Sequence, residues 1–174
     1  MKNKTRQIII GAVILLTVLC LIFIFGNSLK DSTESKEQSD TVKEILMSVA
    51  RLFGFKGDIN LTKLRNLAHI IEFGMLGGCL GTLATYLARR RAESLRARYC
   101  VCLVAAVGTG TVFAVVDELL QLTSAGRACD IADVMLDVVG VVIGVAIGSL
   151  AYLLFIKVIK SRKNKEKDKI VKNP

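Results

Sequence analysis

Carboxylates are concentrated in one short stretch of this 174-residue sequence, DELLQLTSAGRACDIADVMLD, which runs from Asp117 to Asp137. The stretch holds five carboxylates, one arginine and one glutamine, and apolar runs flank it on both sides. Ionisable groups inside an apolar segment are costly, so they are usually functional or paired with one another. This stretch is therefore the strongest candidate for a site.

The spacing of the charged residues predicts that they lie in sets, each on one face of a helix. Residues three, four or seven positions apart lie on the same side of a helix. The sets are Arg65, His69 and Glu72; Asp117 and Gln121, with Glu118 beside them; and Asp130, Asp133 and Asp137. Arg127 lies in the short loop between the last two sets. If the three helices pack together, these residues form one polar cluster.

Several kinds of chemistry fit this cluster. Carboxylates and a histidine could bind a divalent cation, which could then hold a lipid pyrophosphate. The candidate ligands are His69, Asp117, Asp133 and Asp137. The same groups could relay protons, and Arg65 and Arg127 could bind an anionic headgroup directly. The alternative is a purely structural network, in which the basic side chains neutralise the acids and lock the helices together.

Other catalytic signatures are missing from the sequence. No serine or cysteine has a base at an evident spacing, and there is no P-loop, dinucleotide fingerprint or HExxH motif. The DxxDxxxD spacing is only faintly similar to that of membrane CDP-alcohol phosphotransferases, whose glycine and arginine signature is not present. The five cysteines include no CxxC pair and are odd in number, so they predict neither a disulfide framework nor a zinc site.

Four apolar segments could position the charged sets. Mean hydropathy is +0.51 and 52% of residues are hydrophobic, which favours a small helical membrane protein over a soluble enzyme. The segments cover about residues 8–26, 67–88, 99–122 and 131–156. Each is close to the roughly 20 residues that a helix needs to cross the hydrocarbon core. We expect an all-α membrane domain over residues 1–156, with the first segment a retained anchor.

Glycines at four-residue spacing predict close packing between these helices. They are Gly74 and Gly78 in the second segment and Gly140, Gly144 and Gly148 in the fourth, and in the third Gly110 has the same spacing from Ala106 and Ala114. The three glycines of the fourth segment continue the stripe of aspartates, so that stripe is expected to face protein rather than lipid. At about 1.5 Å per residue, Glu72, Asp117 and Asp137 should lie roughly 7–9 Å below the same membrane surface.

The distribution of lysine and arginine predicts the orientation. The N-terminal tail, the loop 89–98 and residues 157–174 together carry 16 basic and 3 acidic residues, whereas the rest carries 8 basic and 12 acidic residues. The positive-inside rule then places both termini and the RRR loop in the cytoplasm, and the polar cluster outside. The basic tail 157–174 is expected to lie on anionic inner-leaflet lipid. It lacks interleaved aromatic residues and does not predict nucleic-acid binding.

The outer loop between the first two segments, residues 27–66, has a helical pattern of its own. Apolar residues in TVKEILMSVARLF predict an amphipathic helix over about 41–53, begun by a capping box of Thr41 and Glu44. This helix is expected to lie on the membrane face or pack over the bundle, or else to grip a lipid or partner. The stretch before it, NSLKDSTESKEQSD, is expected to be loop.

Three patterns together resemble the VanZ-like membrane proteins. They are FIFGNSLKD at 23–31, HIIEFGMLG at 69–77, and DELLQLTSAGRACDIADVMLDVVG at 117–140. The resemblance covers nearly the whole chain apart from the basic tail. Gly26 departs from it, where the family often has serine, and so does TSAGR, which lacks the proline often found before Gly-Arg.

The family takes its name from a protein linked to teicoplanin resistance, and no biochemical activity is generally agreed for it. The resemblance implies a multi-pass protein of the bacterial plasma membrane with a role in the envelope or in glycopeptide susceptibility.

Three functions are consequently open. The first is binding of an anionic envelope component, such as a lipid-linked precursor, at the outer leaflet among membrane lipids. The second is a metal-dependent enzyme that acts on a lipid phosphate. The third is a small carrier, which is disfavoured because the inner halves of the segments are almost free of polar residues and no inverted repeat is detectable.

Overall fold

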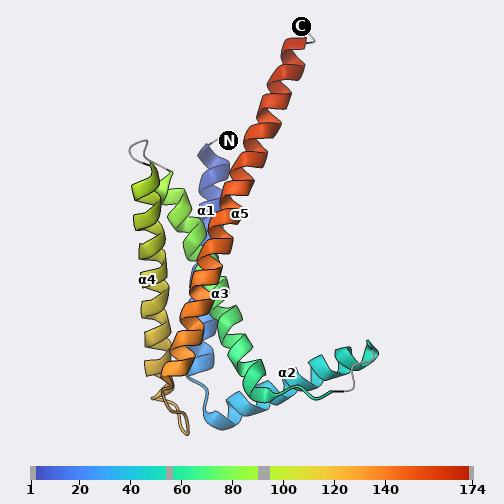
Figure 1. Cartoon of the computed structure of the whole chain (residues 1–174), viewed down its shortest axis with the longest axis vertical. Helices are drawn as coiled ribbons and strands as arrows, with labels where there is room; N and C mark the ends of the chain where they lie inside the picture. The colour runs from blue at the N-terminus through green and yellow to red at the C-terminus, as the bar shows by residue number, and fades with distance from the viewer. Residues whose placement is uncertain (1–2, 54–56, 90–94, 173–174) are drawn as a thin grey trace.

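The computed structural model describes residues 3–53, 57–89 and 95–172, and these ranges fold into helices without any strand. The helices are α1 (Asn3–Ser28), α2 (Ser32–Leu52), α3 (Leu61–Ala88), α4 (Leu95–Gln121) and α5 (Ile131–Lys172). In Figure 1, α1, α3, α4 and α5 run along the long axis of the molecule, whereas α2 projects from one end. Both termini lie at the opposite end.

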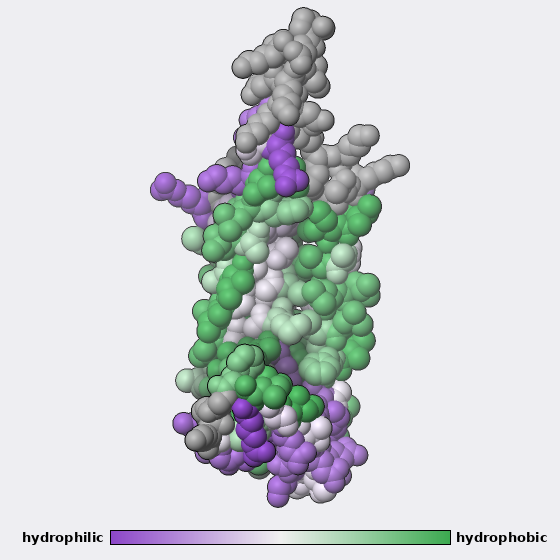
Figure 2. Space-filling view, turned by 90° about the vertical axis from the view of Figure 1, so that its right-hand side faces the viewer, coloured by the Kyte–Doolittle hydropathy of each residue, from purple (hydrophilic) through white to green (hydrophobic). Residues whose placement is uncertain are grey.

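Four helices are long and apolar enough to cross a membrane, which confirms the predicted number of spans. They cover Gln7–Ser28, Leu61–Ala88, Arg96–Gln121 and Ile131–Arg162. Apolar side chains cover most of the bundle on the face shown in Figure 2, and hydrophilic side chains gather at the end where α2 lies. Exposed apolar side chains on these helices include Ile8, Phe23, Val104 and Ile147. Such a surface suits lipid, and the protein is a multi-pass membrane protein.

The pairing of α3 with α5 forms the centre of the bundle. A Cβ added to Gly144 would clash with the carbonyl oxygen of Gly74, and one added to Gly148 would clash with that of Gly78. A Cβ on Gly140 would lie 2.6 Å from the carbonyl oxygen of Ile70. The α5 glycines therefore lie directly against the α3 backbone. Gly110 of α4 lies against the Val141 side chain, so the third helix joins the same core.

The helices α1 and α4 complete the core from the flanks. Ile24 of α1, Phe73 and Leu76 of α3, and Ala114 of α4 are buried around Val141. Phe25 and Phe113 meet edge to face, with ring centroids 6.2 Å apart. This packing holds the end of α1 beside the charged ends of α3, α4 and α5.

The helix α2 begins earlier than the sequence predicted, so the expectation of a loop over residues 32–40 was wrong. Its N-terminus is capped by Asp31, whose Oδ1 accepts hydrogen bonds of 2.8 Å from the backbone N–H groups of Thr33 and Glu34. Thr41 lies inside the helix and donates to the carbonyl oxygen of Glu37, so it is not a cap. The capping Asp31 stabilises the start of α2, although the first residues of this helix are polar.

Most apolar side chains of α2 are exposed, and one of them is buried. Ile45 and Val49 are about half exposed, at 59% and 48%, whereas Met47 is buried. That α2 lies on a membrane face stays a prediction.

Two helix boundaries also differ from the expected spans. Asn60 caps α3, so this helix starts at Leu61 rather than near residue 67. α5 continues as one helix through the basic segment to Lys172. Arg90 and Arg91 of the RRR loop lie outside the described residues.

Candidate functional site

The polar cluster centres on a contact between α3 and α5. His69 Nδ1 lies 3.0 Å from Asp137 Oδ1, and the Asp137 side chain is fully buried. One helical turn further along, Gly140 lies against the backbone of Ile70 and Gly74. The glycine packing brings the two helices close enough for this short histidine–carboxylate pair to form.

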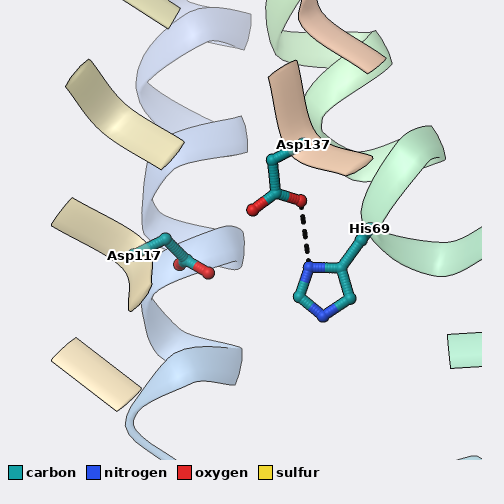
Figure 3. Close-up of side chains that lie close together, drawn as sticks. All are labelled: His69, Asp117 and Asp137. Atoms are coloured by element: carbon teal, nitrogen blue, oxygen red, sulfur yellow. Dashed lines mark hydrogen bonds and ion pairs between the residues drawn. The ribbon is translucent and has the colours of Figure 1, made fainter. Parts of the chain in front are cut away.

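α4 contributes a second buried carboxylate, Asp117, which is 2% exposed. Ser28 Oγ of α1 donates to Asp117 Oδ1, and Gln121 Nε2 donates to Asp117 Oδ2 at 3.1 Å. These donors fix the orientation of the carboxylate. Figure 3 shows the carboxylates of Asp117 and Asp137 directed toward each other, with the His69 ring beside them.

Glu118 is also buried, but its contacts indicate a structural role. Gln121 Nε2 donates to its Oε1 at 2.7 Å, and the backbone N–H of Asp130 donates to its Oε2 at 2.9 Å. Glu118 thus ties the end of α4 to the start of α5. Asp130 is exposed, and its Oδ1 accepts from the backbone N–H of Ala132, as expected of a helix cap.

The end of α1 supplies site residues that the candidate set from the sequence omitted. Asn27 Nδ2 donates to Glu72 Oε1 at 3.3 Å, and the backbone carbonyl oxygen of Asn27 accepts from Arg127 Nη1 at 3.3 Å. Ser28 contacts Asp117, and Ser124 Oγ donates to the Ser28 carbonyl oxygen at 2.9 Å. The FIFGNSLKD pattern marked this segment as part of the family resemblance, which was the only signal available.

The loop between α4 and α5 closes over the cluster. Gly126 has φ = +73°, a left-handed conformation that favours glycine. Ala125 accepts a backbone hydrogen bond of 3.1 Å from Ser32, and a Cβ at Gly126 would lie 2.5 Å from Ser32 Oγ. The loop is therefore seated on the start of α2, which places Arg127 above the buried carboxylates.

Two adjoining hollows open at this end of the bundle. The inner one has a volume of about 140 Å³, and its wall includes Asn27, Ser28, Arg65, His69, Glu72, Asp117, Gln121 and Arg127. The outer one, of about 530 Å³, is lined by Arg65, Arg127, Cys129, Asp130 and Asp133 among others. The two arginines border both hollows, so they stand at the junction between the buried cluster and the surroundings.

The structure separates the candidate residues into two groups. His69, Glu72, Asp117, Gln121, Arg65 and Arg127 surround the inner hollow, with Asp137 and Glu118 buried close to them. Asp130 and the half-buried Asp133 face the outer hollow instead. Of the four candidate metal ligands, His69, Asp117 and Asp137 each offer an atom within 4.8 Å of the others. Asp133 is not part of that group.

Arg127 is the half-buried cation of the site. Burial, followed by the nearby Arg65, lowers the pKa of its guanidinium. An arginine remains charged at neutral pH even so. Neither Arg65 nor Arg127 forms an ion pair with a carboxylate in the part of the chain that the structure describes. Both cations therefore keep hydrogen-bond donors for another group.

Comparison with protein families shows that residues 13–156 match the family described as VanZ/LLP1. The matched range covers the four membrane-length helices except for residues 7–12 and 157–162, and it includes every residue around both hollows. Comparisons with curated proteins and with solved structures give no match.

Proposed function

Because the chain belongs to the VanZ/LLP1 family, we propose that this membrane protein binds an anionic component of the bacterial envelope at the hollows near α2. The component is a lipid phosphate or a lipid-linked precursor. This role would connect the protein with envelope function and, by the resemblance to the teicoplanin-linked protein, with glycopeptide susceptibility.

The observation that carries the proposal is the pair of arginines at the mouth of the inner hollow. Arg65 and Arg127 border both hollows and form no ion pair within the described ranges. Two like charges near each other are unfavourable unless an anion joins them, and guanidinium groups match phosphate and carboxylate geometry. The exposed apolar flanks of the helices leave the site accessible to a lipid whose chains stay in the bilayer.

Lipid binding can be measured by native mass spectrometry of the full chain in detergent. We expect phosphatidylglycerol to bind more tightly than phosphatidylcholine, and Arg127→Gln to weaken that preference by at least about tenfold because a charged partner is lost. Arg51→Gln removes an equal charge from the exposed end of α2 and should leave the preference unchanged. Equal binding of the two lipids, or equal effects of both variants, would contradict the proposal.

The proposal also requires the hollows to face outward, as the basic residues predict. We expect a cysteine at the exposed Ala125 to react with an impermeant maleimide in intact cells, in a background without Cys100 and Cys129. A cysteine at Arg162, near the far end of α5, should react only after lysis. The reverse pattern would place the site in the cytoplasm and exclude an outer-leaflet ligand.

A metal-dependent enzyme is the second candidate, and the group His69, Asp117 and Asp137 favours it. An enzyme predicts turnover of a lipid phosphate, abolished in Asp137→Asn without loss of the fold. Binding alone predicts retention of the lipid unchanged. Mass analysis of the lipid recovered after incubation separates these outcomes.

A further inference from the structure

The cluster contains more negative than positive charge. Glu72, Asp117, Glu118 and Asp137 contribute four carboxylates, and all are buried or half-buried. The cations that border the inner hollow of this cluster are Arg65 and Arg127, and His69 must be neutral to bind a metal ion. Two negative charges thus remain without a partner, and an uncompensated buried charge is strongly unfavourable. A divalent cation would supply the missing charge.

The position of one oxygen atom indicates where such a cation would lie. Asp137 Oδ1 pairs with His69, but Asp137 Oδ2 is fully buried and has no hydrogen-bond partner among the described residues. Figure 3 shows this second oxygen directed toward Asp117. Buried carboxylate oxygens are normally satisfied, so an orphaned one facing another carboxylate points to a bound cation.

We propose that His69, Asp117 and Asp137 bind a single first-row divalent cation of the Mn²⁺ or Zn²⁺ type. Each residue offers one ligand atom, and these atoms lie within 4.8 Å of one another. One imidazole and two carboxylates suit these ions better than Mg²⁺ or Ca²⁺, which prefer oxygen ligands alone.

The neighbours of these ligands have the arrangement that a metal site requires. Ser28 and Gln121 donate to Asp117 and hold its carboxylate toward Asp137 and His69. Hydrogen bonds to ligating carboxylates orient them and strengthen metal binding. The three ligands come from α3, α4 and α5, so an ion would also link these helices.

This inference deepens the proposed function. The cation site itself is argued from its ligands, and only the role of the ion in binding an anion rests on the proposed function. His69 and Asp117 line the inner hollow, and the two arginines stand at its mouth. Without a cation, the carboxylates would repel an anionic headgroup. A divalent ion between them would reverse the local charge and let a phosphate oxygen approach from the arginine side.

The test is Mn²⁺ binding by the full chain in a phosphate-free detergent after treatment with EDTA. Free Mn²⁺ is followed by its electron paramagnetic resonance signal, which weakens as the ion binds. We expect saturation at a single ion per chain, and a loss of affinity of at least about tenfold in Asp137→Asn and in His69→Gln. Asp58→Asn removes an exposed carboxylate outside the bundle and should bind as the unmodified chain does.

Two results would overturn the inference. One is the lack of a saturable Mn²⁺ site in the unmodified protein, with Zn²⁺ unable to bind either. The other is a site whose affinity is unchanged in Asp137→Asn and His69→Gln; using both substitutions keeps the test decisive if one of them prevents folding.

Failure of the inference can be told apart from failure of the proposed function. If EDTA-treated protein still prefers phosphatidylglycerol through Arg127, the anion site exists without a cation. If Mn²⁺ binds but the lipid preference is missing, the cation site stands and the proposed function falls.

Discussion

Replacing Gly144 by alanine should separate α3 from α5, the contact on which the site depends. The added Cβ would clash with the carbonyl oxygen of Gly74 and would lie 2.8 Å from both the carbonyl carbon of Gly74 and the backbone nitrogen of Gly78. These are backbone atoms within a helix, so no side-chain rotation can relieve the clash. The helices must move apart, which weakens the packing around Val141 as well.

The loss in the free energy of unfolding caused by Gly144→Ala can be estimated by comparison with two other glycines. A Cβ on Gly78, across the same interface, would lie 3.8 Å from the carbonyl oxygen of Gly144, an ordinary contact, and one on Gly108 would meet nothing within 4 Å. Overpacking a tight core lowers the free energy of unfolding by about 1–3 kcal/mol. We expect the loss in Gly144→Ala to be near the upper end of this range, because the atoms that clash belong to the backbone and cannot rotate away. Gly108→Ala should instead stabilise its helix by roughly 0.5–1 kcal/mol, since alanine is the better helix former.

The assay is thermal unfolding in detergent, followed with a dye that fluoresces when it reacts with thiols. Cys20 and Cys79 are buried and report unfolding, whereas Cys100 and Cys129 are exposed and can react before the protein unfolds. For a loss of about 2–3 kcal/mol, we expect Tm to fall by roughly 4–12 °C. A Gly144→Ala protein as stable as Gly108→Ala would refute the close α3–α5 contact.

Three further predictions concern the edges of the cluster. Ser28→Ala should lower the free energy of unfolding by about 1–3 kcal/mol because the buried Asp117 carboxylate loses a donor; an unchanged Tm would show that this donor contributes nothing. Gly126→Ala should cost about 1–2 kcal/mol, since its φ of +73° is left-handed, and Gly126→Asn should lose less of the Tm. Partial desolvation and the Glu118 carboxylate raise the pKa of the Cys129 thiol, so its reaction with maleimide at pH 7 should be slower than that of glutathione. Glu118→Gln should speed that reaction, and equal rates in both proteins would show that the carboxylate has no influence.

Helical spacing and hydropathy were sufficient to predict most of the architecture. The four apolar segments correspond to α1, α3, α4 and α5, because a membrane span has a fixed length and a simple composition. The start of α2 could not be predicted in this way, since its first turns are polar on all sides. Its helix depends on the Asp31 cap, a local hydrogen bond that hydrophobic periodicity does not register.

The candidate site could be predicted only in part. Helical periodicity shows which residues share a face of a helix, but it does not show which of them contact residues on another helix. Asp133 and Asp137 lie on the same stripe of α5, yet Asp133 faces the outer hollow and Asp137 is buried against His69. That difference arises because α3 closes over α5 at Gly140, one turn beyond Asp137. Asn27 and Ser28 have no charge and no periodic signal, and their part in the site follows from where α1 ends.

By itself, the sequence determined an all-helical membrane protein of the VanZ/LLP1 family, with charged sets on three helices. These properties depend on local composition and on the repeat of the helix, both of which can be read along the chain. Only the tertiary structure decided that His69, Asp117 and Asp137 converge, that Glu118 binds the α4–α5 loop, and that two arginines border the hollows. Convergence depends on the distance and rotation between helices, which are fixed by glycines in contact with a neighbouring backbone rather than by the charged residues themselves.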